Sequence, residues 1–335
     1  MDQKRLLAVC DNDINYALAL SSALNSALYG RFEISTFNNI QTLCDHLESN
    51  EVDTVIVSES AYDKDMLQVF GVTVLLLKES PDFMDEDVIT TDRFQSREKL
   101  VGSILEALAE SFSGIPTSDY RAAKWKVVGI YSPIRRSLQT NFALSLGQML
   151  GAKSKVLYMN FENFSGFSGW FNTEFKSDIV DLLYFFDCEK EKLSLKLPLM
   201  IHKIGDLDIL PPAGSYHDTY DVGGAKWIQL FETIGCTSDY EYLILDLTDA
   251  MQGLMDVMGY CDRIYTLVKD DIISRAKLAQ YEAWMVEHSK ADIVGKTLKF
   301  DLPQFTDIPA DPYMLTHCEL AGYVRAIIDD DEIGA

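Results

Sequence analysis

The sequence predicts an α/β protein built from two doubly wound domains with mainly parallel sheets. Short apolar runs alternate with amphipathic stretches of helical periodicity, the pattern of parallel α/β architecture. This alternation stops at a Ser/Gly/Pro-rich stretch, SFSGIPTSDY, and then starts again. The length of 335 residues also suits roughly two domains. We expect domains at 1–110 and 125–330, a linker at 111–124, and a solvated acidic tail at 331–335.

In the first domain, five apolar runs are expected to form strands, with helices between them. Ile40, Leu43 and Leu47 recur at the i, i+3, i+7 spacing of a helix that covers a sheet. The expected strands are Leu6–Cys10, Phe32–Phe37, Thr54–Val57, Thr73–Leu77 and Val88–Thr90, and the expected helices include Tyr16–Leu28, Ile40–Ser49 and Arg97–Glu110.

The second domain repeats this alternation over a longer stretch. The apolar helix Asn141–Leu150 follows its first strand, and His317–Ile328 is expected as its last helix. The expected strands are Trp125–Tyr131, Lys155–Asn160, Leu207–Leu210, Tyr242–Leu247, Arg263–Val268 and Lys296–Leu302.

Charge and composition exclude several classes of protein. With 47% apolar and 24% charged residues, the chain is neither disordered nor fibrous. The 29 basic and 52 acidic residues give a net charge of −23, which repels nucleic acid and anionic lipid. No apolar run is long enough to span a bilayer, and the six cysteines show no CxxC pairing. We therefore expect a reduced, cytoplasmic protein without a membrane helix.

Two acidic residues follow the first expected strand, in the sequence CDND at Cys10–Asp13. With five β/α units in about 110 residues, this segment resembles a response-regulator receiver domain. The resemblance implies an acidic pocket at Asp11, Asp13 and Ser58, but Ser58 stands where the family has its phosphorylated Asp. Asp92 stands where the family has its Lys. Because an aspartyl phosphate needs a carboxylate nucleophile and a nearby cation, we expect a pseudo-receiver used for contacts.

Two interpretations of the acidic pair are open. Asp11 and Asp13 either hold Mg²⁺ or cap the helix that begins at Ile14, and capping is the one we favour.

The segment KVVGIYSPIRRSLQTNFALSLGQML has a buried strand, a loop and an apolar helix, the context of a P-loop. It resembles the MinD/ParA group of deviant Walker ATPases, with Thr140 at the position of the Mg²⁺-binding hydroxyl. Leu138 replaces the final glycine of the loop, Gln139 its phosphate-binding lysine, and Ile134 its signature lysine. The implied nucleotide-binding residues are Ser132, Pro133, Ile134, Arg135, Arg136, Ser137, Leu138, Gln139, Thr140 and Asn141.

Downstream segments extend the resemblance over about residues 125–330. Asn160 and Glu162 follow the second strand, where relatives carry switch I acids, and Asp246 ends the strand of DYEYLILDL, matching the Walker B aspartate. If nucleotide binds, the resemblance implies ATP with Mg²⁺ held at Thr140 and Asp246.

The domain order is similar to that of TadZ/CpaE-like proteins, which join an atypical receiver to a MinD/ParA-type domain. The resemblance implies an assembly or localisation factor for Flp/Tad-type pili or secretion machinery. It also implies protein partners from that apparatus, a homodimer, and recruitment to the membrane or pole by those partners. The acidic C-terminus CELAGYVRAIIDDDEIGA lacks the lysines of the MinD membrane helix.

Several alternatives stay open from the residues alone. Arg135 and Arg136 either replace the lost lysines or lie in a solvated or partner-contacting loop. Asp246 is either a Mg²⁺ site or a structural acid, and Thr140 either a ligand or a helix cap. Whether the protein is an enzyme is therefore undecided. A non-enzymatic factor is favoured over a Mg²⁺-dependent ATPase, and a phosphorylated response regulator is the weakest hypothesis.

Overall fold

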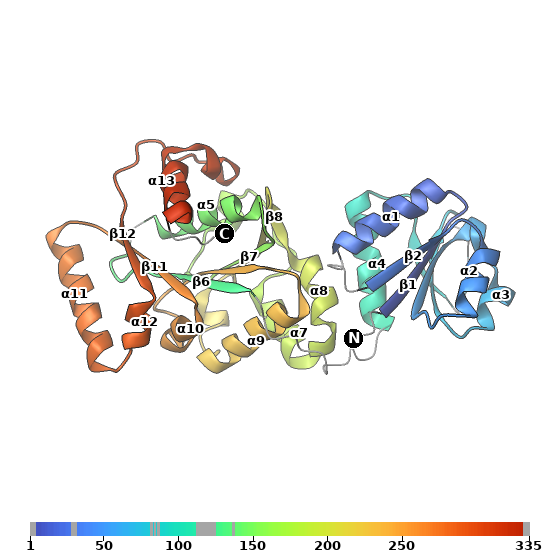
Figure 1. The fold of residues 1–335 in the computed structure, drawn as a ribbon, viewed down its shortest axis with the longest axis horizontal. Helices are drawn as coiled ribbons and strands as arrows, with labels where there is room; N and C mark the ends of the chain where they lie inside the picture. Colours follow the sequence, from blue (N-terminus) through green and yellow to red (C-terminus); the bar gives the residue numbers. More distant parts are fainter. Residues whose placement is uncertain are drawn as a thin grey trace. The chain divides into compact units, whose positions relative to one another are not determined.

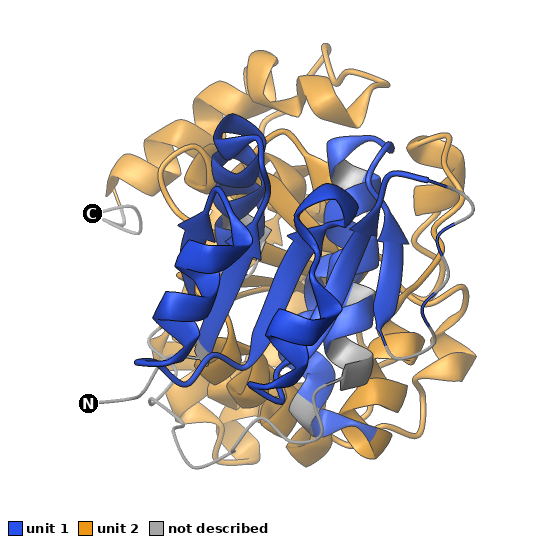
Figure 2. Ribbon diagram, turned by 90° about the vertical axis from the view of Figure 1, so that its right-hand side faces the viewer, with its two compact units in different colours: residues 1–119, 189–199 blue, residues 120–188, 200–335 orange. Residues whose placement is uncertain are grey.

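The computed structural model describes residues 5–27, 32–80, 83, 85, 88–111, 125–135 and 138–330. The chain divides into two compact units, which Figure 2 colours separately. Unit 1 comprises Met1–Asp119 and Glu189–Leu199, and unit 2 comprises Tyr120–Cys188 and Met200–Ala335. The expected linker beyond Ser111 and the acidic tail lie outside the described residues. No helix in the described ranges is both long and apolar enough to cross a membrane.

Unit 1 is a five-stranded parallel sheet in the order β2-β1-β3-β4-β5, the doubly wound order of flavodoxin. The central strand β3 is buried at all five positions, as expected for a strand covered on both faces. The strands are β1 (Arg5–Cys10), β2 (Phe32–Phe37), β3 (Thr54–Ser58), β4 (Thr73–Lys78) and β5 (Ile89–Asp92).

Helices cover both faces of this sheet (Figure 1). The side chain of Asn39 caps α2 by accepting a hydrogen bond from the Thr42 amide, and Leu43 and Leu47 of this helix are buried. The helices are α1 (Ile14–Ala27), α2 (Ile40–Leu47), α3 (Lys64–Gln68) and α4 (Arg97–Ser111), with the 3₁₀ turn η1 (Glu59–Ala61).

Unit 1 also includes a segment from far along the chain. The 3₁₀ turn η3 (Lys190–Lys192) and helix α8 (Leu193–Met200) follow α7 (Ile179–Cys188). Leu195 of α8 is 1% exposed and belongs to one apolar cluster with residues of α1 and α4. From the sequence, we expected all of 125–330 to belong to the second domain. Residues 189–199 depart from that boundary because their leucines complete the core of unit 1.

Unit 2 is a seven-stranded sheet in the order β12-β11-β6-β10-β7-β9-β8. All pairings are parallel except that of β8 with β9, and β8 is a strand that the sequence analysis did not anticipate. The strands are β6 (Lys126–Ile130), β7 (Val156–Asn160), β8 (His202–Ile204), β9 (Leu207–Leu210), β10 (Tyr242–Asp246), β11 (Arg263–Val268) and β12 (Thr297–Asp301). The predicted α/β class with mainly parallel sheets is confirmed in both units.

The helices of unit 2 also lie on both faces of its sheet (Figure 1). Helix α5 packs with α13 over one face, and its residues Phe142 and Leu146 are fully buried. The elements are α5 (Gln139–Gly151), α6 (Phe167–Trp170), α7 (Ile179–Cys188), η4 (Tyr216–Asp218), α9 (Gly224–Thr237), α10 (Leu254–Tyr260), α11 (Ile272–Glu287), α12 (Ala291–Gly295), η5 (Pro312–His317) and α13 (Glu319–Asp330).

The sheet order decides where a ligand site can form. Strand β10 lies between β6 and β7, and Asp246 at its end is in register with Ile130 and Asn160. Ligands of open α/β sheets bind at the carboxyl ends of such strands. The loops after β6, β7 and β10 therefore meet at one edge.

Candidate functional site

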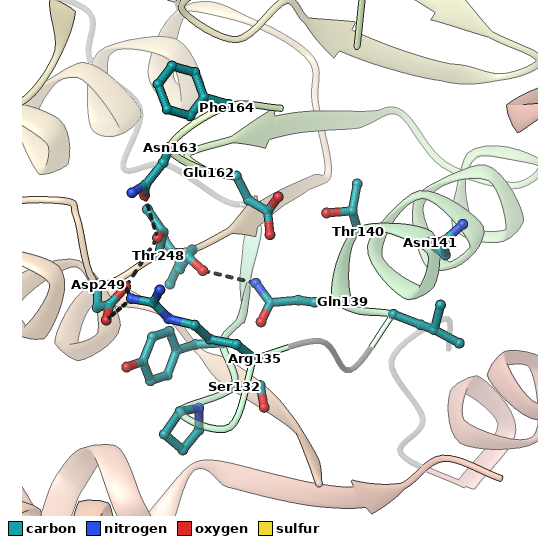
Figure 3. Close-up of a pocket in the computed structure, with 14 residues that line it drawn as sticks. Ser132, Arg135, Gln139, Thr140, Asn141, Glu162, Asn163, Phe164, Thr248 and Asp249 are labelled. Atoms are coloured by element: carbon teal, nitrogen blue, oxygen red, sulfur yellow. Dashed lines mark hydrogen bonds and ion pairs between the residues drawn. The ribbon is translucent and has the colours of Figure 1, made fainter. Parts of the chain in front are cut away.

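A cavity of about 450 Å³ lies where the loops after β6, β7 and β10 meet the start of α5 (Figure 3). This volume is within the range of small-molecule sites. It is lined by Tyr131, Ser132, Pro133, Arg135, Leu138, Gln139, Thr140, Asn141, Glu162, Asn163, Phe164, Leu247, Thr248 and Asp249.

The loop between β6 and α5 adopts a conformation that glycine would adopt more easily. Arg135 and Leu138 both have left-handed backbone angles, with φ of 59° and 58°. Leucine pays a steric cost there that glycine does not. The Ser132 hydroxyl donates to the Leu267 carbonyl at 2.5 Å, and Ile134 is buried away from the cavity lining. Arg136 and Ser137 lie outside the described residues.

Asp246 is a fully buried carboxylate beneath this cavity and is not part of its lining. Its Oδ1 accepts a hydrogen bond from Gln139 Nε2 at 2.6 Å. Its Oδ2 accepts from the Thr140 hydroxyl at 2.8 Å and from Tyr158 OH and Asn160 Nδ2, each at 2.9 Å. Four side chains of the protein therefore donate hydrogen bonds to the Asp246 carboxylate.

Two of these donors are fixed by bonds of their own. Gln139 Nε2 also donates to the Leu247 carbonyl at 2.9 Å. The Oδ1 of Asn160 accepts from the Glu162 amide at 2.9 Å, which leaves its Nδ2 to face Asp246. We call Gln139, Thr140, Tyr158 and Asn160, together with Asp246, the Asp246 network.

Burial raises the pKa of Asp246, and the hydrogen bonds from the network act against that rise. The Tyr158 hydroxyl is equally buried, and burial with the charge of Asp246 raises its pKa well above the ordinary value. For Glu162, desolvation at the cavity wall raises the pKa, Asp246 adds to the rise and Arg135 opposes it. Although its side chain still contacts solvent, Glu162 therefore lies in a region that disfavours further negative charge.

Among the described residues that line the cavity, Arg135 is the one with a cationic side chain. Its guanidinium donates to both carboxylate oxygens of Asp249 (Figure 3). With Glu162 and Asp249 opposing one arginine, the described lining carries a net negative charge. This balance is unfavourable for a phosphate chain, which needs cations or free amides.

The structure brings together most of the residues that the sequence singled out. Gln139, Thr140, Asn160 and Asp246 form one network, Glu162 lies above it, and Pro133 and Asn141 line the cavity. Sequence reasoning missed Tyr158 and Asp249. Tyr158 lies two residues before Asn160 in a buried strand, so its side chain had to point to the same face. That spacing was the available signal.

The two acidic residues after β1 of unit 1 have different roles. Asp13 caps α1, since its Oδ1 accepts from the amides of Asn15 at 3.0 Å and Tyr16 at 3.4 Å. Asp11 is 1% exposed, and its Oδ2 pairs with Arg93 Nη2 at 2.9 Å. Ser58 is fully buried, and its hydroxyl is 3.3 Å from that of Ser60.

Arg93 is a residue that the sequence analysis did not identify, although it follows Asp92 directly. Its guanidinium also binds the Glu79 carboxylate and lies 4.2 Å from the centre of the Tyr16 ring. A protein cation therefore neutralises the buried acid of unit 1. Within the described ranges, no cluster of three or more His, Cys, Asp or Glu side chains is arranged to hold a metal ion.

No protein-family model and no curated protein matches the sequence. Among solved structures, the chain is similar to a ParA family ATPase from Chlorobium tepidum, with 15% identity, a TM-score of 0.43, and 61% of this chain and 92% of that chain covered. It is similar to a putative plasmid partition protein from Borrelia burgdorferi bound to AMPPNP, with 12% identity, a TM-score of 0.44, and 62% and 99% covered. The cell division ATPase MinD of Pyrococcus furiosus matches with 14% identity, a TM-score of 0.41, and 56% and 75% covered.

We predict that Asp246→Ala destabilises the protein without any ligand present. The substitution removes the common acceptor of two buried donors, Tyr158 and Asn160, and of two half-buried donors, Gln139 and Thr140. We expect the free energy of unfolding to fall by at least about 3 kcal/mol. Denaturant unfolding measures this loss. The control is Asp249→Ala, which removes an exposed ion pair and should cost at most about 1 kcal/mol. Equal stability of Asp246→Ala and the unsubstituted protein would show that Asp246 has no structural role.

A second prediction concerns Arg93→Met, which leaves the buried Asp11 without its counter-charge. We expect a loss of about 3–5 kcal/mol in the free energy of unfolding. Arg93→Met combined with Asp11→Asn should recover part of the loss, because no buried charge then remains. Lys64→Met is the control, since its ion pair with Asp85 involves a lysine that is 42% exposed. A double variant no more stable than Arg93→Met would contradict this assignment.

Proposed function

We propose that this protein is a MinD/ParA-like assembly or positioning factor that binds nucleotide weakly or not at all. The observation that carries the proposal is the Asp246 network. In the MinD/ParA resemblance, Asp246 and Thr140 would hold Mg²⁺ and Gln139 stands in place of a lysine. Here the Thr140 hydroxyl and the Gln139 amide are both directed at the Asp246 carboxylate.

The residues present do not fit a metal-bound nucleotide in this arrangement. Oδ2 of Asp246 already accepts three hydrogen bonds, so a Mg²⁺ ion or its water would have to displace a protein donor. The described lining offers phosphates no cation other than Arg135, which is paired with Asp249. We therefore derive no hydrolytic step for this site.

Unit 1 supports a contact role in the same proposal. Its strand order is that of doubly wound domains. However, Ser58 cannot form an acyl phosphate, and Asp11, which would hold a metal ion, is paired with Arg93. We assign to unit 1 the part of a pseudo-receiver that contacts other proteins.

The alternative is an active Mg²⁺-dependent ATPase that dimerises around nucleotide. The cavity favours it, since about 450 Å³ opens at the first turn of α5, where backbone amides can receive phosphates. It requires Thr140 and Asp246 to leave their network and Arg135 to leave Asp249.

Nucleotide binding separates these two functions. We expect millimolar Mg²⁺-ATP to leave the thermal unfolding midpoint of the full chain unchanged and to be turned over no faster than without protein. Ligand binding to the folded state would raise the midpoint by mass action. Leu138→Gly with Gln139→Lys should gain affinity, because glycine suits the left-handed position and lysine supplies the missing charge. Leu138→Gly alone is the control. Mg²⁺-dependent turnover by the unsubstituted protein would establish the ATPase instead.

For the partners, we propose components of a Flp/Tad-type pilus or secretion apparatus, which recruit this protein to the membrane or pole. The order of the two units supports this choice. A biotin-ligase fusion of the full chain should label such components more strongly than the free ligase does. Equal labelling by both would contradict this part of the proposal.

A further inference from the structure

Helix α11 (Ile272–Glu287) lies at one end of the unit 2 sheet (Figure 1). It presents several large apolar side chains to solvent. Ile272 is 76% exposed, Ile273 65% and Val286 69%. The helix contacts the sheet through its other face, where Ser274 and Met285 are buried. A surface helix ordinarily directs polar residues away from the core, whereas here no described part of the chain covers these apolar side chains.

The exposed apolar residues form a single stripe. Ile272, Ala276, Ala279, Ala283 and Val286 are separated by four, three, four and three residues, and all five are exposed. At 100° per residue they span roughly 80° of the helix circumference. The alanines at the centre would let a second helix approach closely, at an interaxial distance of about 8 Å. We call these five residues the α11 stripe.

Charged and large apolar residues flank the stripe in pairs. Arg275 and Glu282 lie seven residues apart, two turns, on one flank. Ile273 and Trp284 lie eleven residues apart, three turns, on the other flank. Arg275 is 64% exposed and pairs with the exposed Asp270, and Glu282 pairs with Lys299. Trp284 is 41% exposed and stacks on His288.

Both flanking pairs have nearly the same centre as the stripe, which is Ala279. A second copy can pack antiparallel on this stripe, related to the first by a two-fold axis that passes at Ala279. This symmetry places each flank next to the same flank of the other copy. Arg275 lies about 6 Å before this centre and Glu282 about 4.5 Å after it, at 1.5 Å per residue. Each arginine would therefore meet the glutamate of the other copy, whereas Ile273 and Trp284, at about 100° and 120° from the centre of the stripe, would lie outside this contact.

We propose that two copies of this protein associate through an antiparallel pairing of their α11 stripes. The pattern is self-complementary in charge and in shape, which an isologous interface requires and a foreign partner does not. This interface contains no residue of the cavity beneath the P-loop-like segment. The association is therefore independent of nucleotide and of the function proposed above.

One helix pair buries less than the 1,200–2,000 Å² of a standard stable interface, so we expect weak, concentration-dependent association. The charge of −23 on each copy opposes it at low salt, and measurements belong at physiological ionic strength, where the screening length is about 8 Å. Sedimentation of the full chain without nucleotide should show a monomer–dimer equilibrium. A monomer throughout a range up to hundreds of micromolar would overturn the proposal.

Charge exchange tests the predicted contact between copies. Arg275→Glu alone and Glu282→Arg alone should each weaken association about tenfold or more, because like charges then meet across the two-fold axis. The double variant should restore it, since the pairs are exchanged together. Lys277→Glu, on the same helix but away from the stripe, is the matched control. Failure of the double variant to recover association, with its thermal midpoint unchanged, would contradict the pairing.

Cysteine cross-linking tests the position of the axis. In a Cys188→Ser background, which removes the exposed native thiol, Ala279→Cys should form disulfide-linked dimers under mild oxidation. Ala283→Cys is exposed on the same stripe, but the two copies of this residue would lie about 12 Å apart along the helix axis. It should cross-link far more slowly. Equal rates for the two variants would overturn the antiparallel arrangement.

Discussion

The buried carboxylate of Asp246 constrains the whole carboxyl edge of the unit 2 sheet. A carboxylate without solvent must be hydrogen-bonded, and its donors come from the start of α5 and from the neighbouring strand β7. These bonds connect the first turn of α5, the end of β7 and the end of β10. The shape of the cavity is therefore maintained by the protein itself and does not depend on a ligand.

The two units stabilise their buried carboxylates with different protein groups. In unit 1, the guanidinium of Arg93 neutralises Asp11 and is shared with Glu79. In unit 2, neutral donors surround Asp246, and burial leaves its pKa raised. In both units the carboxyl ends of parallel strands, where ligands of such folds bind, carry acids already occupied by protein groups. This shared feature supports the proposal that the protein acts through contacts with other proteins.

The sequence predicted the described strands other than β8, because most of them are short apolar runs bounded by polar residues. The expected Thr54–Val57 became Thr54–Ser58, and Asp246 ended its strand as expected. The side chains that bind the buried acids Asp246 and Asp11 were harder to predict. Gln139 and Asp246 are 107 residues apart, and the long side chain of Arg93 reaches Asp11 from another loop. The placement of α8 also escaped prediction, since a run of leucines does not say which core it will join.

Association through the α11 stripe differs in its physical basis from a dimer that forms around bound nucleotide. In a nucleotide-gated dimer the ligand supplies much of the interface, and the Asp246 network leaves little scope for that ligand here. A helix with exposed Ile272 and Val286 offers apolar burial that needs no cofactor, and its small residues reduce the side-chain entropy lost on pairing. The fraction of paired copies then depends on protein concentration and ionic strength, and on no ligand. Local accumulation by partners would then promote pairing by mass action, which couples recruitment to assembly without hydrolysis.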